Sequence, residues 1–157
     1  MALKRAQIRL TEEERRDFLT KGKTIYLASN GEDGYPHLIA MWYAVQDDGS
    51  IVMTTFRKSQ KVTNLRRDPR CAVLLEEGAT YDKLKGLFLR GECEIIDDEE
   101  RTLTTLGKIG ARASGSGTPP PREAMEAMRG QARKRVTLVF RATKTRSWDH
   151  AKLGGAY

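Results

Sequence analysis

Residues 54–70 read TTFRKSQKVTNLRRDPR, and the interpretation of the whole chain depends on this stretch. It follows the apolar run at 51–53, which is typical of a buried strand. Ser59 is a residue type favoured at helix N-caps, and Pro69 cannot continue a helix. We therefore expect a strand end followed by a short helix whose apolar face carries Val62 and Leu65.

The same stretch has the composition of an anion site. Six of its seventeen residues are Arg or Lys, and one is acidic. The free N–H groups of a first helical turn, together with the helix dipole, favour a phosphate or another anion. Lys61 lies in that first turn, so its ammonium group can fold over the ligand. The alternative interpretation is a solvated basic helix after a hairpin.

The bulk properties indicate one domain, residues 1–157, with 39% hydrophobic and 31% charged residues. No apolar run approaches the roughly 20 residues that span a bilayer, and residues 1–5 begin no signal peptide, so we expect a cytoplasmic protein. Cys71 and Cys93 fall in apolar strand patterns, which predicts two buried thiols. Because the two His and two Cys residues are scattered, we expect no metal site.

The net charge of +7 and the pI near 9.6 imply an anionic partner. Nucleic acid is one class of polyanion, but the chain carries no zinc finger and no aromatic-studded RNA-recognition strand. We expect no nucleic-acid partner. A small polyanionic cofactor accounts for the charge equally well.

Hydrophobic periodicity predicts a mainly β (α+β) fold. A capping box at Thr11 and Glu14 begins a helix that ends near Gly22. Six strands are expected near residues 24–29, 36–45, 50–55, 71–76, 87–96 and 136–144. Gly91 in mid-strand suggests a bulge, or a close approach by a ligand or a second backbone. Helices are expected at 98–112 and 122–133, joined by a linker at 113–121.

Such a meander closes into a six-stranded antiparallel barrel with peripheral helices, because closure removes the exposed strand edges. The strands near 36–46 and 86–96 carry apolar residues on both faces. One face would fill the barrel and the other needs a cover. A second copy of the chain supplies that cover most simply, so we expect a two-fold homodimer.

Several stretches together carry a family resemblance: 34–37 (GYPH), 54–55, 61–70, 87–96 and 146–153 (RSWDHAKL). The chain resembles the split β-barrel flavin and deazaflavin oxidoreductases related to pyridoxamine 5′-phosphate oxidase, whose fold is of the FMN-binding split-barrel type. It is most similar to the actinobacterial branch that uses the deazaflavin coenzyme F420. The resemblance covers essentially the whole chain, and 61–70 is its most specific part.

The resemblance implies a cofactor groove between two subunits, with a phosphate at the start of the short helix. It implies these cofactor-binding residues: Pro36, His37, Ile39, Met41, Thr54, Thr55, Arg57, Lys58, Ser59 and Lys61. Two departures weaken an FMN assignment. Apolar Ile39 or Ala40 stands where the oxidases usually carry a flavin-contacting Arg, and Gln60 interrupts their usual Ser-Arg-Lys run.

The polyglutamate tail of coenzyme F420 would need a looser basic trail. Candidate cations are Lys58, Arg66, Arg67, Arg129, Arg133, Lys134 and Arg135. The resemblance implies hydride transfer from reduced F420 to a conjugated substrate, such as a quinone, an enone or a tetrapyrrole. No catalytic acid–base pair is visible. Two alternatives remain, an FMN-dependent oxidoreductase on the same fold and a non-catalytic carrier of the cofactor, of haem or of a small anion.

Overall fold

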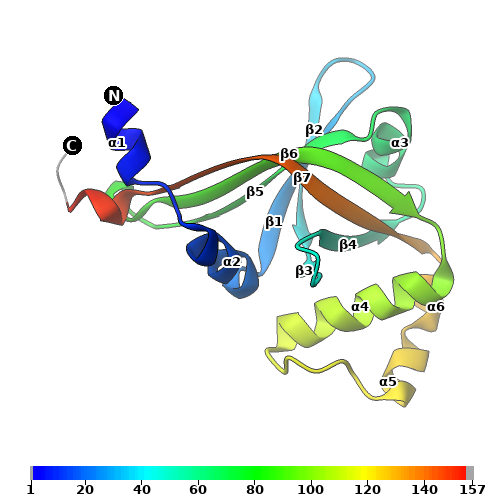
Figure 1. The fold of residues 1–157 in the computed structure, drawn as a ribbon. Coiled ribbons are helices and arrows are strands. Elements are labelled where there is room, and N and C mark those ends of the chain that lie inside the picture. Colours follow the sequence, from blue (N-terminus) through cyan, green and yellow to red (C-terminus); the bar gives the residue numbers. More distant parts are fainter. Residues whose placement is uncertain (1, 155–157) are drawn as a thin grey trace.

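The structure is a computed structural model that describes residues 2–154 (Figure 1). Its helices are α1 (Ala2–Gln7), α2 (Glu12–Lys21), α3 (Gln60–Arg67), α4 (Glu99–Ser114), α5 (Arg122–Ala127) and α6 (Arg129–Ala132), with 3₁₀ helices η1 (Tyr81–Lys83) and η2 (His150–Leu153). Its strands are β1 (Thr24–Asn30), β2 (Pro36–Trp42), β3 (Ala44–Val45), β4 (Ile51–Phe56), β5 (Arg70–Glu77), β6 (Lys85–Ile96) and β7 (Arg135–Asp149).

These strands form one antiparallel sheet in the order β2-β1-β5-β6-β7-β4-β3. The two end strands, β2 and β3, follow one another in the chain with a single residue between them. The sheet must therefore curl until its ends meet, as a split barrel does. The mainly β fold with peripheral helices is confirmed.

The expected count of six strands was one too low for the described residues. The apolar stretch predicted as one strand breaks at Tyr43, where pairing changes from β1 to β4. The side chain of Tyr43 is buried, and its hydroxyl donates to the carbonyl of Leu19 at 2.7 Å. Its own carbonyl accepts a hydrogen bond from Arg112 at 3.1 Å instead of joining the ladder. Tyr43 is thus the corner at which the barrel closes.

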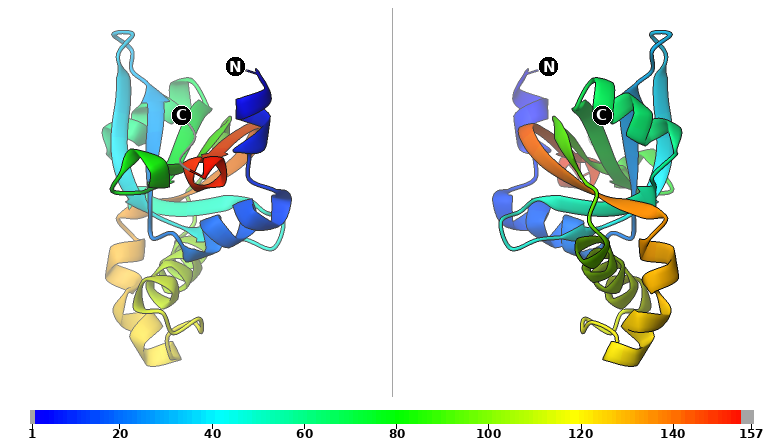
Figure 2. Two further views of the ribbon diagram at one scale, coloured as in Figure 1. Left: turned by 90° about the vertical axis from the view of Figure 1, so that its left-hand side faces the viewer. Right: turned by 90° about the vertical axis from the view of Figure 1, so that its right-hand side faces the viewer.

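The main core fills the curled sheet, and α4 covers part of its other face. Alternate residues of β4 and β7, such as Met53 and Leu138, lie in the main core. Their neighbours Val52 and Val139 pack against Ile109 of α4. Figure 2 shows α4, α5 and α6 on the side of the barrel opposite the β1–β2 hairpin.

Several local predictions are confirmed. Thr11 and Glu14 form the capping box of α2. The register of β6 and β7 shifts at Gly91, where a Cβ atom would lie 1.9 Å from the carbonyl oxygen of Arg141. Cys71 and Cys93 are both buried and free. The helix expected at 122–133 is instead split, since Met128 separates α5 from α6.

The strands β5, β6 and β7 extend beyond the barrel as an arm (Figure 1). At its far end α1 and η2 lie close together, and the amide of Asp149 donates to the carbonyl of Ile8 at 2.7 Å. Trp148 packs there on Gly86. Among residues 2–154, no helix combines the length and the hydropathy that crossing a bilayer requires.

Candidate anion and cofactor site

The anion site predicted from the sequence would lie at the N-terminus of α3. Ser59 has the extended backbone of an N-cap, but its side chain makes no capping hydrogen bond. Its hydroxyl instead lies 3.3 Å from the hydroxyl of Thr55. The amides of Ser59 and Val62 already donate to the carbonyls of Phe56 and Ser59. Among the described residues, the first turn of α3 therefore leaves the amides of Gln60 and Lys61 as free donors beside these two hydroxyls. Val62 and Leu65 are buried and fix the helix against the core.

Lys61 is the central residue of this site. It is 9% exposed, and its ammonium group donates to the hydroxyl of Thr55 at 2.9 Å. Among residues 2–154 it forms no ion pair, because no carboxylate reaches it. Burial, and secondarily the charge of Arg135, lower the pKa of Lys61. A buried cation whose charge is unfavourable gains most from an anionic ligand.

Arg135 was expected only as part of a loose trail, and alternation along β7 directs its side chain to the face of the sheet that packs on α4, opposite the face of Thr55. It is the first residue of β7 and pairs with Phe56 at the end of β4, next to the pair formed by Thr55 and Val136. Its guanidinium lies over the ring of Phe56, 4.2 Å from the centroid. Its Nε is buried and has no hydrogen-bond partner among the described residues. Sequence reasoning missed this arrangement because it depends on the pairing of β4 with β7.

Two other predicted cations are already engaged. Arg57 forms an ion pair with Asp97 and donates to the carbonyl of Arg133 at 3.0 Å. Arg66 lies 3.9 Å from the same Asp97. Lys58 is exposed in the turn before α3. Lys134 is also exposed, and it lies near Lys58 because its carbonyl accepts a hydrogen bond from the amide of Arg57.

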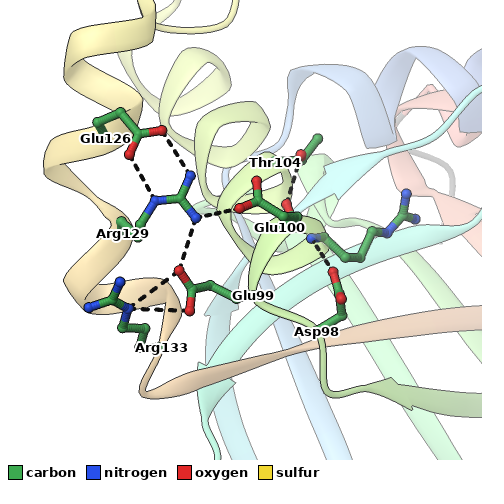
Figure 3. A network of polar contacts seen from close by, with 8 residues as sticks. Asp98, Glu99, Glu100, Thr104, Glu126, Arg129 and Arg133 are labelled. Carbon is green, nitrogen blue, oxygen red and sulfur yellow. Dashed lines mark hydrogen bonds and ion pairs between the residues drawn. The ribbon is translucent and has the colours of Figure 1, made fainter.

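Arg129 and Arg133 do not provide free charge for a trail. Arg129 bridges Glu126 at 2.8 Å, Glu99 at 2.9 Å and Glu100 (Figure 3). Arg133 contacts Glu99 at 3.3 Å. Hydrogen bonds from Arg129 lower the pKa of Glu99 and of Glu126. The cluster therefore fastens α6 to the first turn of α4, and both arginines are paired with glutamates.

The predicted residues of β2 fall into three environments. Pro36 and His37 line a cavity of about 420 Å³ between the β1–β2 hairpin and α3. Nδ1 of His37 is buried without a partner among the described residues. Ile39 is exposed on the strand, whereas Met41 is buried in the main core.

Polar side chains of α3 form one wall of that cavity. Gln60 donates to Asn64 at 2.9 Å, and Asn64 in turn donates to the buried hydroxyl of Ser29 at 3.2 Å. Neither Gln60 nor Asn64 was expected at a site. Thr54 was expected at the site. It alternates with Thr55 along β4, so its side chain is directed to the other face of the sheet, which packs on α4.

A second cavity, of about 440 Å³, lies between α4 and β3. Its walls are largely apolar, and Arg112, which borders it, is bound to backbone carbonyls. It therefore fits an anion poorly, although it is slightly larger. No group of His, Cys, Asp and Glu residues in the described chain could hold a metal ion.

Comparisons with known proteins agree with this architecture. The family model described as pyridoxamine 5′-phosphate oxidase matches residues 11–149. No curated protein matches the chain. A conserved hypothetical protein from Mycobacterium tuberculosis has a similar structure, with 44% identity, 98% of this chain and 93% of that one covered, and a TM-score of 0.88.

Two further structures are more distant. An F420 reductase shares 27% identity over 83% of this chain and 94% of that one, with a TM-score of 0.63. A haem storage protein from Vibrio cholerae shares 14% identity over 85% and 90% of the two chains, with a TM-score of 0.62. The latter likeness shows the fold alone.

Proposed function

The chain belongs to the pyridoxamine 5′-phosphate oxidase family, and from that premise we propose that it is an oxidoreductase that binds coenzyme F420 at the start of α3. The observation that carries the proposal is the buried ammonium of Lys61, which is bonded to Thr55 and has no acidic partner among the described residues. A buried cation without a counter-ion is costly unless a ligand supplies the negative charge.

The residues present fit a phosphate group. Lys61 would contribute a charge-assisted hydrogen bond, and the hydroxyls of Thr55 and Ser59 would contribute neutral ones. The free N–H groups of the first turn of α3 add donors and the positive end of the helix dipole. These groups come from adjoining segments, so one phosphate can reach all of them.

Three features favour F420 over FMN. The solved F420 reductase, which is named for that coenzyme, shares 27% sequence identity with this chain. Ile39 and Ala40 are apolar where a flavin-contacting Arg is usual in the oxidases. Lys58 and Lys134 remain exposed beside the site, and they could contact an anionic tail.

When bound, reduced coenzyme F420 supplies a hydride for an electron-poor double bond, and we propose a flat conjugated compound, such as a quinone, an enone or a tetrapyrrole, as its acceptor. The chain's own contribution is binding and orientation. The anion site fixes one end of the coenzyme. The cavity beside His37, which Gln60 and Asn64 of α3 also line, and the exposed part of β2 are available to the rest of it.

Titration of the purified protein with F420 and with FMN tests this function. We expect quenching of deazaflavin fluorescence at lower concentration than any change in flavin absorbance. Shortening the polyglutamate tail should weaken binding at low salt and matter little at high salt, because exposed charge contacts are screened. Preferential FMN binding would favour the alternative flavin enzyme. Tight F420 binding without turnover of any quinone or enone would favour a carrier.

We also propose that the protein is a homodimer built on the outer face of β2. Leu38 is 63% exposed and Trp42 62% exposed on the same face of that strand, with Ala40 between them. Neighbouring exposed apolar side chains of this size mark an interaction surface. A second copy would bury them and would bring a second chain to the cofactor groove.

A charge placed in this face should separate the subunits. We expect Leu38→Glu to halve the mass measured by sedimentation, since an unpaired carboxylate cannot be buried in an apolar interface. Ala124→Glu, which adds the same charge at an exposed position of α5, is the matched control and should leave the mass unchanged. A wild-type monomer, or a Leu38→Glu dimer, would contradict the assignment.

A further inference from the structure

The charge of the anion site indicates which class of phosphate group it takes, an inference that rests on the proposed function. A phosphomonoester carries close to two negative charges at neutral pH, whereas a phosphodiester carries one. We propose that Gln60 is a specificity-determining residue, whose neutral side chain adapts the site to a phosphodiester rather than to a phosphomonoester.

Positive charge around the first turn of α3 is limited in the described chain. Lys61 is 9% exposed and forms no ion pair among the described residues. Arg57 and Arg66 share the carboxylate of Asp97. Lys58 is exposed, so water and salt screen its charge. Lys61 thus supplies one full positive charge that neither a carboxylate nor solvent offsets.

Gln60 lies next to Lys61 as the first residue of α3 and adds no charge. Its side-chain nitrogen donates to Asn64 at 2.9 Å. Asn64 is fully buried and donates to the buried hydroxyl of Ser29 at 3.2 Å. Because this chain of hydrogen bonds ends on a buried residue of β1, it holds the side chain of Gln60 along α3. A neutral amide therefore occupies a position at which a basic residue would bring a second cation to the anion.

The second charge of a phosphomonoester would have no counter-charge at this site. A charge removed from water is unfavourable unless an opposite charge accompanies it. The free amides of the first turn and the hydroxyls of Thr55 and Ser59 donate to phosphate oxygens, but these groups are neutral. A phosphodiester, with its single negative charge, matches the single charge of Lys61.

The surroundings of Gln60 also leave room for two substituents. A phosphodiester carries a substituent on each of two oxygens, whereas a phosphomonoester carries only one. Gln60 lines the cavity of about 420 Å³ beside His37. Ser59, which precedes Gln60, follows the exposed turn at Lys58. One substituent can enter the cavity while the other leaves along the turn to solvent.

Dissociation constants for a matched pair of probes test the proposal. The probes are the deazaflavin portion of F420 as a 5′-phosphate monoester and the methyl ester of the same compound, titrated by fluorescence at neutral pH. We expect the wild type to bind the methyl ester more tightly. Gln60→Arg should raise the affinity for the monoester about ten-fold relative to that for the methyl ester, because the guanidinium donates a charge-assisted hydrogen bond to the second charge.

Two controls separate a local charge from other effects. Gln60→Met removes the hydrogen bond to Asn64 without adding a charge, and Ala124→Arg adds the same charge at an exposed position of α5. Both variants should keep the wild-type ratio of the two dissociation constants. Thermal unfolding of each variant checks that it is folded.

The outcomes distinguish this inference from the proposed function. Suppose that F420 binds and that Lys61→Met weakens its binding. If the wild type then prefers the monoester, or if Gln60→Arg leaves the ratio unchanged, the role of Gln60 is wrong and the anion site stands. If the wild type binds neither F420 nor either probe, the site and the inference both fail.

Discussion

Replacement of Arg112 with alanine is expected to lower the free energy of unfolding by about 3–5 kcal/mol, the largest stability effect that we predict for a polar side chain. Its guanidinium donates to the carbonyls of Leu19, Thr20 and Gly22, where α2 ends, and to that of Tyr43. It also stacks on the ring of Tyr43 at 3.9 Å. Arg112 of α4 thus caps the C-terminus of α2 and also stabilises the barrel corner at Tyr43.

The effect is large because, once Arg112 is removed, these carbonyls lose the side chain that donates hydrogen bonds to them. Terminal carbonyls of a helix have no partner within it, and a cation there also interacts favourably with the helix dipole. Arg112→Lys keeps the charge but cannot reach four acceptors with one ammonium group, so it should recover less than half of the loss. Urea denaturation followed by circular dichroism measures both.

Lys108→Ala is the matched control for Arg112. Lys108 lies one turn earlier on α4 and is exposed, so its loss should change the free energy of unfolding by less than about 0.5 kcal/mol. Should Arg112→Ala cost no more than this control, Arg112 would be only one of several equivalent supports for the corner.

Replacement of Lys61 with methionine is expected to produce two opposite effects. Ligand affinity should fall by about 1.5–3 kcal/mol, because a charge-assisted hydrogen bond to phosphate is lost. The ligand-free protein should become more stable, because methionine fills similar space without burying a charge. An increase of 1 kcal/mol would raise the melting temperature by roughly 2–4 °C in a chain of this size.

The pH dependence follows from the lowered pKa of Lys61. At pH values below the folded-state pKa the amine is protonated in both states, and its burial then costs stability. Between the folded-state value and the ordinary value of lysine, the unfolded chain binds more protons, so the stability of the wild type rises with pH. The stability difference between Lys61→Met and the wild type should therefore shrink in alkaline solution.

Lys58→Met is the control for a general charge effect. Lys58 is exposed in the turn before α3, so its removal should weaken F420 binding only modestly and only at low salt. If Lys61→Met bound F420 as tightly as the wild type, the phosphate would have to be held elsewhere, and the proposed site would be wrong.

Features encoded within a few residues were predictable. The helix at 60–67, the capping box at Thr11 and the bulge at Gly91 each follow from local chemistry that any tertiary context must respect. Lys61 and Ser59 were also identified as neighbours, because they lie within one helical turn. Periodicity likewise indicated the strands, apart from the break at Tyr43.

Contacts between distant segments were not predictable in the same way. The charges of Arg129 and Arg133 looked available in the sequence, yet the fold brings glutamates of α4 and α5 to them. Tyr43 showed no signal of a corner, because its partners come from α2 and α4.

The amino-acid order alone determined that a basic helix N-terminus follows a strand in this protein. It therefore predicts an anion-binding site, because the donors of one helical turn are neighbours along the chain. The tertiary structure decided which cations are paired with carboxylates and which are not. Pairing of β4 with β7 sets Arg135 against an aromatic ring, while the packing of α6 on α4 neutralises Arg129. Free charge depends on the distance to the nearest carboxylate, and that distance exists only once the chain has folded.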